Sequence, residues 1–338
     1  MKKLISLICV LAMVLALAAC GSSAPAAATE APAASTEAPA EEVSADKTFV
    51  VGICQLVQHP ALDAATQGFK DALTEALGDK VTFQEQNASG DSATCSLICN
   101  QFVSDEVDLI MANATASIQA AASATNTIPI LGTSITDYGV ALGVDNWTGV
   151  SGTNISGTSD LAPLDGQAAM IQELFPEAKT IGLLYCSGEP NSIFQADSME
   201  ALLTDMGYSV ERYTFADSND VSSVTANACS NSDVLYIPTD NTAASCTEAI
   251  NNVALSAGIP IVAGEEGLAS GCGVATLSIS YYDLGRATGE MAAEILTEGA
   301  DISTMEVRFA PAFTKEYNAD ICEALNITVP EDYVAIAK

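Results

Sequence analysis

Basic residues are scarce in this chain of 338 residues, which has 11 Lys and Arg against 43 Asp and Glu and a formal net charge of −32. Nucleic-acid binding needs a basic face that follows the phosphates, and so few cations cannot form a large one. We therefore expect no nucleic-acid partner. The excess of acidic residues is explained by solubility or, alternatively, by attraction of a cationic ligand.

Compact catalytic and nucleotide-binding motifs are also missing. The chain has no GxSxG, HExxH or GxxxxGK[ST] pattern, which mark α/β-hydrolases, zinc proteases and P-loop ATPases. Paired carboxylates such as Glu189 and Asp240 leave an extracellular enzyme as an alternative, because carboxylates serve acid–base chemistry. We expect a protein that is not an enzyme, needs no cofactor and carries no ATPase of its own.

The single histidine and the cysteine spacings give no metal site. Cys95 and Cys99 stand four apart on a predicted helix, but a zinc site needs two further soft ligands, and His59 lies elsewhere. We expect no bound metal and mostly buried, apolar thiols, with disulfide pairing left open. The cysteines after residue 46 are Cys54, Cys95, Cys99, Cys186, Cys229, Cys246, Cys272 and Cys322.

The first 46 residues predict export rather than folding. Two lysines precede an apolar run up to Ala19 that is shorter than the about 20 residues needed to span a bilayer. The run ends at Leu17-Ala18-Ala19-Cys20, which resembles a bacterial lipobox and implies lipidation of Cys20. Ordinary secretory cleavage beside an incidental cysteine is the alternative. Residues 20–46, rich in Ala, Pro, Ser, Thr and Glu, predict a flexible linker.

The remainder of the chain contains one β/α unit twice. The apolar stretch DVLYIPTDN (Asp233–Asn241) matches DLIMANAT (Asp108–Thr115). Each is followed by an alanine-rich helix and then by a second apolar strand, IPILGTS (Ile128–Ser134) or IPIVAGEE (Ile259–Glu266). Short apolar runs of this kind predict strands buried on both faces. The repeat therefore predicts an α/β protein of two doubly wound parallel-sheet lobes.

Two segments near the carboxyl end have no counterpart in the first half. The predicted helix 283–298 and the predicted strand 306–310 fit return crossings between the lobes, which makes both lobes discontinuous. We expect a first lobe of residues 47–158 plus 281–303 and a second lobe of residues 159–280 plus 304–338. Residues 147–159, dense in Gly, Ser, Thr and Asn, are typical of a hinge.

Ligands of open parallel sheets bind beyond the carboxyl ends of the strands, so two such lobes present their loops to one cleft. Helices that begin after Thr115, Asn191 and Thr242 direct N–H groups toward a ligand carboxylate. Candidate partners of an ammonium group are Asp137, Glu189, Asp240 and Asp283, and candidate aromatic walls are Tyr138, Phe194 and Tyr281. The candidate ligand-binding residues are Gln55, His59, Thr115, Ser117, Thr133, Asp137, Glu189, Asn191, Ser192, Asp240, Asn241, Glu265, Tyr281 and Asp283.

Four motifs make the chain similar to one family. They are QLVQHPALD (Gln55–Asp63), EPNS (Glu189–Ser192), Asp240-Asn241 and YYDLG (Tyr281–Gly285). Together they resemble the ABC-transporter substrate-binding lipoproteins of the tryptophan/tyrosine-binding type, which have the type I periplasmic-binding-protein fold. The resemblance extends over residues 47–330.

The resemblance implies a lipid-anchored monomer outside the cytoplasm that captures a small solute by lobe closure. The solute is an aromatic or other apolar amino acid, and the partner is an ABC permease with separate ATPase subunits. Ala116-Ser117 and Tyr138 depart from the family's Pro-Ala pair and proline at those positions. Because both lie beside the pocket, a nucleoside or sugar ligand stays open. Ligand sensing for a signalling partner is a further alternative.

Overall fold

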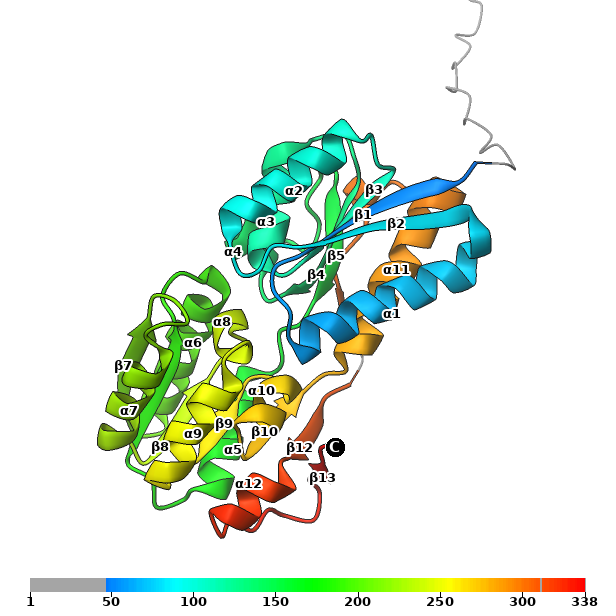
Figure 1. Ribbon diagram of the computed structural model, residues 1–338. Coiled ribbons are helices and arrows are strands. Elements are labelled where there is room, and N and C mark those ends of the chain that lie inside the picture. The colour runs from blue at the N-terminus through cyan, green and yellow to red at the C-terminus, as the bar shows by residue number, and fades with distance from the viewer. Residues whose placement is uncertain (1–46, 311, 338) are drawn as a thin grey trace, which may run out of the picture. The chain divides into compact units, whose positions relative to one another are not determined.

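The computed structural model describes residues 47–310 and 312–337 as two α/β lobes (Figure 1). The predicted signal peptide, linker and Cys20 lie outside these residues. Each lobe has its own sheet with helices on its faces. The two-lobed, mostly parallel architecture predicted from the sequence is confirmed.

The first sheet is parallel throughout, with strand order β11-β5-β4-β3-β1-β2. Every residue of its central strands β3 and β4 is buried, as expected for strands covered on both faces. Its strands are β1 (Phe49–Gln55), β2 (Val81–Asn87), β3 (Leu109–Asn113), β4 (Ile130–Ile135), β5 (Ile155–Ser159) and β11 (Arg308–Phe309). Its helices are α1 (Pro60–Leu77), α2 (Ser92–Ser104), α3 (Thr115–Ala124), α4 (Tyr138–Leu142) and α11 (Tyr281–Glu298), with 3₁₀ turns at Gly78–Lys80 and Ile302–Thr304.

The second sheet has the order β13-β12-β10-β9-β8-β6-β7, and only the β10–β12 pair within it is antiparallel among the described residues. Its strands are β6 (Thr180–Cys186), β7 (Ser209–Phe215), β8 (Val234–Ile237), β9 (Ile261–Ala263), β10 (Ala275–Ser278), β12 (Thr314–Tyr317) and β13 (Val334–Ala335). Its helices are α5 (Leu164–Leu174), α6 (Pro190–Asp205), α7 (Val221–Asn231), α8 (Asn241–Ala244), α9 (Thr247–Ala257), α10 (Glu266–Gly271) and α12 (Ala319–Ala324).

The two sheets repeat the same strand order. The series β2-β1-β3-β4-β5 in the first sheet corresponds to β7-β6-β8-β9-β10 in the second. The predicted internal repeat is therefore confirmed at the level of topology. Because the strands of each series are parallel, their carboxyl ends lie at one edge of each sheet, where ligand sites of such folds form.

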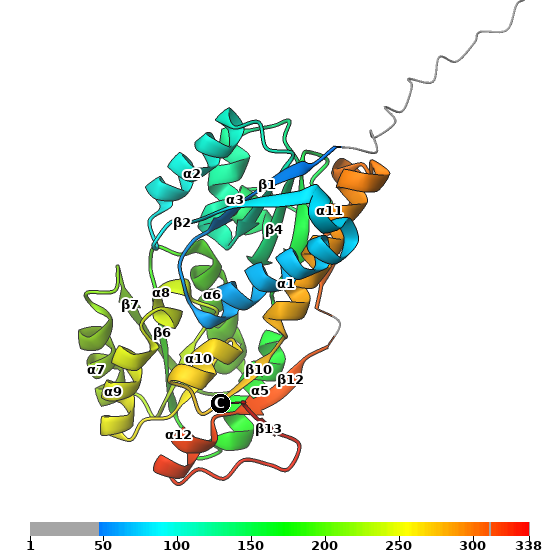
Figure 2. The same ribbon diagram turned by 45° about the vertical axis from the view of Figure 1, so that its right-hand side comes forward.

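Helix α11 returns the chain to the first lobe and lies along α1 (Figures 1 and 2). The two helices approach closely at glycines: a Cβ atom added to Gly285 would lie 1.9 Å from the carbonyl oxygen of Ala65. The helix begins at Tyr281, two residues before the predicted start, and the Ser280 hydroxyl caps it by accepting the N–H of Asp283.

Strand β11 corrects the predicted boundary between the lobes. Arg308 and Phe309 pair with Thr158 and Ser159 of β5, so they extend the first sheet. The predicted strand 306–310 was expected in the second lobe, because a short apolar segment does not show which sheet it joins. Arg308 also donates to Glu294 of α11, which ties the strand to the first lobe. The chain passes to the second lobe between β11 and β12.

The cysteines after residue 46 are all free thiols, and all but Cys246 are buried. This confirms the interpretation of most of them as small apolar core residues. Among the residues that the structure describes, no three His, Cys, Asp or Glu side chains are grouped so that they can hold a metal. Within the same residues, no helix combines the length and the apolar character needed to cross a membrane.

Candidate functional site

A cavity of about 10 Å³ lies between the two lobes. Both lobes line it, and Figure 2 shows the start of α1 facing α10 of the second lobe in this region. Its lining residues are His59, Leu62, Ser134, Thr136, Asp160, Asn191, Thr239, Asp240, Asn241, Ala244, Glu265 and Tyr281. Most of these carry polar side chains, although all of them except Asn241 are buried.

His59 reaches the cavity from the start of α1. It precedes Pro60, which disfavours helical backbone at the residue before it, and it has the extended values φ −160° and ψ 164°. Its Nε2 lies 3.3 Å from Oδ1 of Asn241 in the other lobe. Its Nδ1 is buried and has no hydrogen-bond partner among the described residues. Burial lowers the pKa of His59, which favours the neutral imidazole.

Asp160 follows β5, where the chain leaves the first lobe. Its Oδ2 accepts a hydrogen bond of 2.9 Å from the Tyr281 hydroxyl. Its Oδ1 has no partner in the described part of the chain, and the residue is only 4% exposed. Burial raises the pKa of Asp160, since a carboxylate without a cation is poorly solvated there.

Ser134 faces the cavity from a distortion of β4. The register between β4 and β5 shifts between Gly132 and Ile135, and Ser134 has a positive φ of 56°. Bulges of this kind redirect a side chain at the end of a strand, and a serine held in this backbone region is under strain. Its hydroxyl oxygen is buried and makes no hydrogen bond within the described residues. The local backbone thus directs an unpaired hydroxyl to the site.

Asp240 and Glu265 are caps of short helices in the second lobe. Asp240 accepts the N–H of Ala243 at 2.8 Å on Oδ1 and that of Cys186 at 2.6 Å on Oδ2. Burial, together with the charge of Glu189, raises the pKa of Asp240 to about 8. Glu265 accepts the N–H groups of residues 267 and 268, and burial raises its pKa to about 7. Both carboxyls therefore face the cavity at an electrostatic cost.

Glu189 holds the start of α8. Its carboxylate accepts the backbone N–H and the side-chain Nδ2 of Asn241 at 3.0 and 2.8 Å, and the N–H and hydroxyl of Thr242 at 2.8 Å each. Asp240 accepts the next N–H along the chain. From the sequence, this helix start is predicted to offer free N–H groups to a ligand carboxylate. That expectation is wrong, because side chains of the same lobe already accept them.

Direct hydrogen bonds join the lobes beside the cavity. The hydroxyls of Thr136 and Thr239 lie 3.3 Å apart, and Gln195 contacts both of them, at 3.4 and 2.5 Å. Thr136 follows β4 in the first lobe, whereas Thr239 and Gln195 belong to the second. The lobes are therefore closed on one another in this structure.

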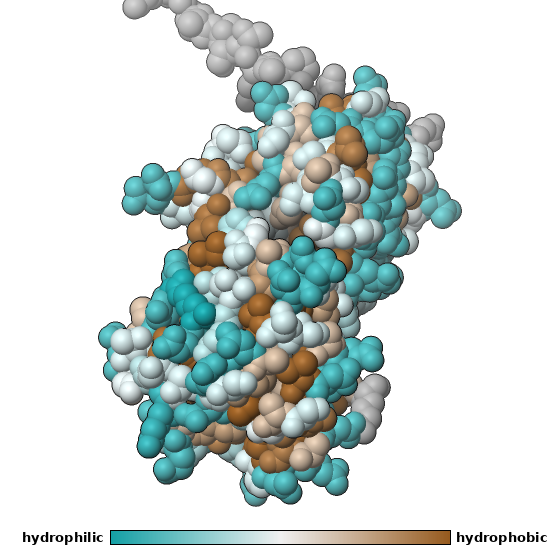
Figure 3. Space-filling view, turned by 60° about the vertical axis from the view of Figure 1, so that its left-hand side comes forward, coloured by the Kyte–Doolittle hydropathy of each residue, from teal (hydrophilic) through white to brown (hydrophobic). Residues whose placement is uncertain are grey.

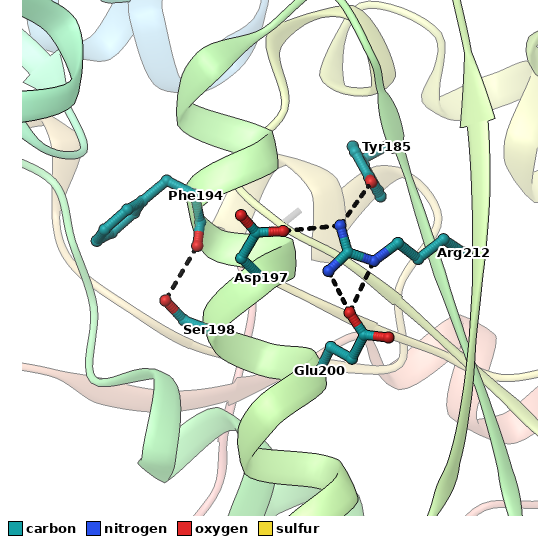
Figure 4. Close-up of polar contacts among 6 residues, drawn as sticks. All are labelled: Tyr185, Phe194, Asp197, Ser198, Glu200 and Arg212. Carbon is teal, nitrogen blue, oxygen red and sulfur yellow. Dashed lines mark hydrogen bonds and ion pairs between the residues drawn. The ribbon is translucent and has the colours of Figure 1, made fainter. Parts of the chain in front are cut away.

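Helix α6, which carries Asn191 and Gln195, is fixed on its outer side by Arg212 of β7 (Figure 4). The Arg212 guanidinium donates to Asp197 at 2.7 Å and, through Nε, to Glu200 at 2.8 Å. It also donates to the Tyr185 hydroxyl at 3.3 Å. These contacts hold the helix against β6 and β7 and so position its inner face at the cleft.

The structure brings six of the predicted ligand-binding residues to the cavity: His59, Asn191, Asp240, Asn241, Glu265 and Tyr281. Glu189 lies in an adjoining groove, and Ser192 is fully buried and accepts a hydrogen bond of 3.3 Å from Nδ2 of Asn191. Asp283 is exposed on α11, away from the cavity lining.

Five other predicted residues serve the first lobe itself. Gln55 donates to Asp63 and accepts from Thr66, whereas Thr133 pairs with Thr158 within the sheet. Ser117 lies against the thiols of Cys54 and Cys95, Asp137 caps α4, and Thr115 is buried at the first turn of α3. Of the proposed aromatic walls, only Tyr281 lines the cavity. Tyr138 instead donates to Gly132 within the lobe and stacks on Trp147.

Sequence reasoning missed Thr136, Asp160 and Thr239 as site residues. All three follow a strand at its carboxyl end, which is the signal that would have found them. Asp160 was overlooked because it directly follows the segment interpreted as a hinge. A carboxyl residue immediately after a buried strand is itself a sign of a ligand site in this kind of fold.

A larger groove of about 460 Å³ adjoins the cavity and shares Asn191 and Asn241 with it. The first lobe contributes Leu56, Val57 and the start of α2, and the second lobe contributes the loops after β6 and β7. Its size falls within the about 300–1,000 Å³ typical of small-molecule pockets.

Comparison with known proteins gives consistent matches. The family model for "ABC transporter substrate binding protein" matches residues 50–338. A tyrosine-binding protein of Clostridioides difficile (strain R20291) is 38% identical over 280 residues, which cover 82% of this chain and 81% of that protein.

Two solved structures, one with a bound ligand and one open and ligand-free, resemble this chain to different degrees. The ABC domain in complex with L-Trp from Streptococcus pneumonia has a TM-score of 0.80 at 32% identity, covering 84% of this chain and 97% of that chain. The ligand-free, open structure of a substrate binding protein with adhesive properties from Clostridium difficile has a TM-score of 0.66 at 37% identity, covering 86% and 99%. The lower score with the more identical, open protein agrees with closed lobes here.

Proposed function

The chain belongs to the family of ABC transporter substrate-binding proteins, and from this premise we propose that it captures an aromatic amino acid between its lobes for delivery to a permease. The ligand class is supported by the relatives, one named for tyrosine and one bound to L-Trp. The site adds support of its own, independent of their names.

The observation that carries the proposal is a set of unpartnered polar atoms. His59 Nδ1, Ser134 Oγ and Asp160 Oδ1 are buried, lack hydrogen-bond partners among the described residues and line one cavity. Buried polar groups are nearly always paired, so three orphans around one point indicate a missing polar guest. A ligand with a small polar head satisfies them.

The acidic side chains of the site favour a ligand with a positively charged polar group. Asp160, Asp240 and Glu265 are buried at the cavity, and none of the described residues that line it is a lysine or an arginine. Buried carboxyls without a counterion are unfavourable, and an ammonium group supplies one. Asp160 is the stronger partner of the ammonium, because both oxygens of Asp240 already accept backbone N–H groups.

The remainder of the ligand needs more room than the cavity provides. A volume of about 10 Å³ accommodates one water molecule at most, so entry requires the lobes to separate. We place the aromatic side chain toward the adjoining groove of about 460 Å³. Closure then removes water from the ligand and strengthens its charge pairing with Asp160.

We further propose that the protein acts as an extracytoplasmic lipoprotein monomer without catalytic turnover. The lipobox-like sequence before Cys20 supports a lipid anchor, and the family implies a permease with separate ATPase subunits. Hydrophobic residues on the face in Figure 3 are interspersed with hydrophilic ones, which suits a monomer. Cells given an alkyne-tagged palmitate should label the wild-type protein, and Cys20→Ala should abolish the label.

Calorimetric titration of the purified protein, unfolded and refolded to remove bound solute, tests the ligand. We expect binding of L-tyrosine, L-tryptophan or L-phenylalanine, and recovery of the ligand chemically unchanged. Nucleosides and simple sugars serve as controls. Binding of a sugar or nucleoside without any amino acid would overturn the assignment of the ligand, and detectable turnover would overturn the non-enzymatic role.

A further inference from the structure

The amide of Asn241 has a defined orientation. Its Nδ2 donates to Glu189 Oε2 at 2.8 Å, so its Oδ1 faces the His59 Nε2 at 3.3 Å. A carboxylate accepts hydrogen bonds and donates none, so turning the amide over would set its oxygen against the carboxylate oxygen. Glu189 therefore decides which atom of Asn241 the other lobe meets.

This orientation determines the tautomer of His59. The Asn241 oxygen accepts only, so the Nε2 that faces it must carry the proton. In the neutral ring the other nitrogen, Nδ1, then has a lone pair and no proton. Nδ1 is the atom that is buried at the cavity without a partner in the described residues. The ligand thus meets a hydrogen-bond acceptor at this position.

The other two unpartnered atoms at the cavity can also accept hydrogen bonds. Asp160 Oδ1 accepts, and Ser134 Oγ has lone pairs that can accept. Together with His59 Nδ1 they supply three acceptors, which equals the number of N–H donors on a primary ammonium group. A carboxylate placed at this point would be repelled, because neither His59 Nδ1 nor Asp160 Oδ1 has a proton to donate to it.

We propose that Glu189, through Asn241, holds His59 as the Nε2–H tautomer, so that His59, Asp160 and Ser134 form a three-acceptor site for an unsubstituted ammonium group. Glu189 is a positioning residue, because it acts through Asn241 and His59. This inference rests on the proposed capture of an amino acid and adds that the amino group must be primary. It assigns the polar head of the ligand to this side of the cavity.

His59 is the only histidine in the chain, so its imidazole gives an unambiguous nitrogen spectrum. Long-range ¹H–¹⁵N correlation of the purified protein, with ¹⁵N-labelled histidine, reports which ring nitrogen is protonated. We expect the Nε2–H tautomer near neutral pH in the ligand-free and tyrosine-bound protein. The Nδ1–H tautomer, or an imidazolium, would overturn the proposal. The ligand-free spectrum tests the tautomer even if no aromatic amino acid binds. An absence of binding would contradict only the proposed function.

Glu189→Gln tests the positioning role. Glutamine can present an N–H to Asn241, so we expect the second tautomer of His59 to be populated and the affinity for L-tyrosine to fall about tenfold, the effect of one hydrogen bond. The matched control Asp283→Asn makes the same acid-to-amide change on an exposed site and should alter neither. An unchanged tautomer and affinity in Glu189→Gln would overturn the role. If this variant fails to fold, the wild-type spectrum still decides.

The ligand offers a complementary test. N-methyl-L-tyrosine has one N–H fewer and a methyl group that must fit in the same confined space, so we expect it to bind at least about tenfold more weakly than L-tyrosine. Equal affinity for the two would contradict a site built for three donors.

Discussion

The replacement Asp160→Asn isolates the charge that we assign to ligand capture. The side chain is 4% exposed, its Oδ2 accepts from Tyr281 at 2.9 Å, and its Oδ1 faces the cavity. Asparagine keeps the shape and can still accept from Tyr281, but it removes the negative charge. Any effect on binding therefore reports the charge rather than the packing.

The magnitude follows from the burial of the pair. Removing one partner of a buried, hydrogen-bonded charge pair weakens binding by about 2–5 kcal/mol. At about 1.4 kcal/mol for each factor of ten, Kd for L-tyrosine should rise about 30-fold to several thousand-fold. The ligand-free protein should respond in the opposite direction. It should keep its stability or gain about 1 kcal/mol, because the substitution removes a buried carboxyl that lacks a cation.

Isothermal titration calorimetry and thermal unfolding without ligand measure the two effects on the same samples. The control Asp283→Asn changes an exposed acid and should leave Kd within about threefold, as surface substitutions usually do. Binding by Asp160→Asn within threefold of wild type would refute the pairing of Asp160 with an ammonium group. Weaker binding accompanied by a large loss of stability would instead identify Asp160 as a structural residue.

Three further predictions concern the caps, the helix pair and the interlobe contact. Burial raises the pKa of Glu265 to about 7 and that of Asp240 to about 8, so the folded protein binds more protons than the unfolded chain. The stability of the ligand-free protein should therefore fall as the pH rises from about 5 to about 8. Denaturant unfolding at several pH values should show this fall, and the fall should be smaller in Glu265→Gln. Gly285→Ala places a Cβ atom 1.9 Å from a backbone oxygen of α1 and should lower the free energy of unfolding by about 3 kcal/mol. The control Gly188→Ala, whose Cβ atom would lie 3.7 Å from its nearest neighbour, should not lower it. Equal unfolding midpoints for the two variants would contradict the close packing of α1 and α11. Thr239→Val removes a hydroxyl that contacts Thr136 and Gln195, so small-angle scattering without ligand should show a larger fraction of open molecules than in the wild type.

Local sequence predicted most of the fold because burial and secondary structure depend on residues close together in the chain. The apolar run of β3 is buried at every position, as its composition predicted. The repeated β/α pattern predicted two sheets of equal topology. Strand β11 was assigned to the wrong lobe because a short strand does not reveal its partner, and only pairing with β5 places it in the first sheet.

The site was predictable only in part. His59 and Asn241 were found because each follows the carboxyl end of a strand, where such folds bind ligands. Gln55 and Thr133 also stand at strand ends, but their side chains bond within the first lobe. Neighbouring residues at the end of a strand point in opposite directions, and a distortion such as that at Ser134 alters the direction again.

The sequence alone determined that this protein has two repeated α/β lobes, a polar cleft and an acidic character. The tertiary structure decided which polar atoms meet there. The contact between His59 and Asn241 joins residues 182 positions apart, and Asp160 becomes a site residue only because Tyr281 of α11 and the second lobe enclose it. Such contacts depend on how distant segments pack, and no short stretch of the sequence contains that information.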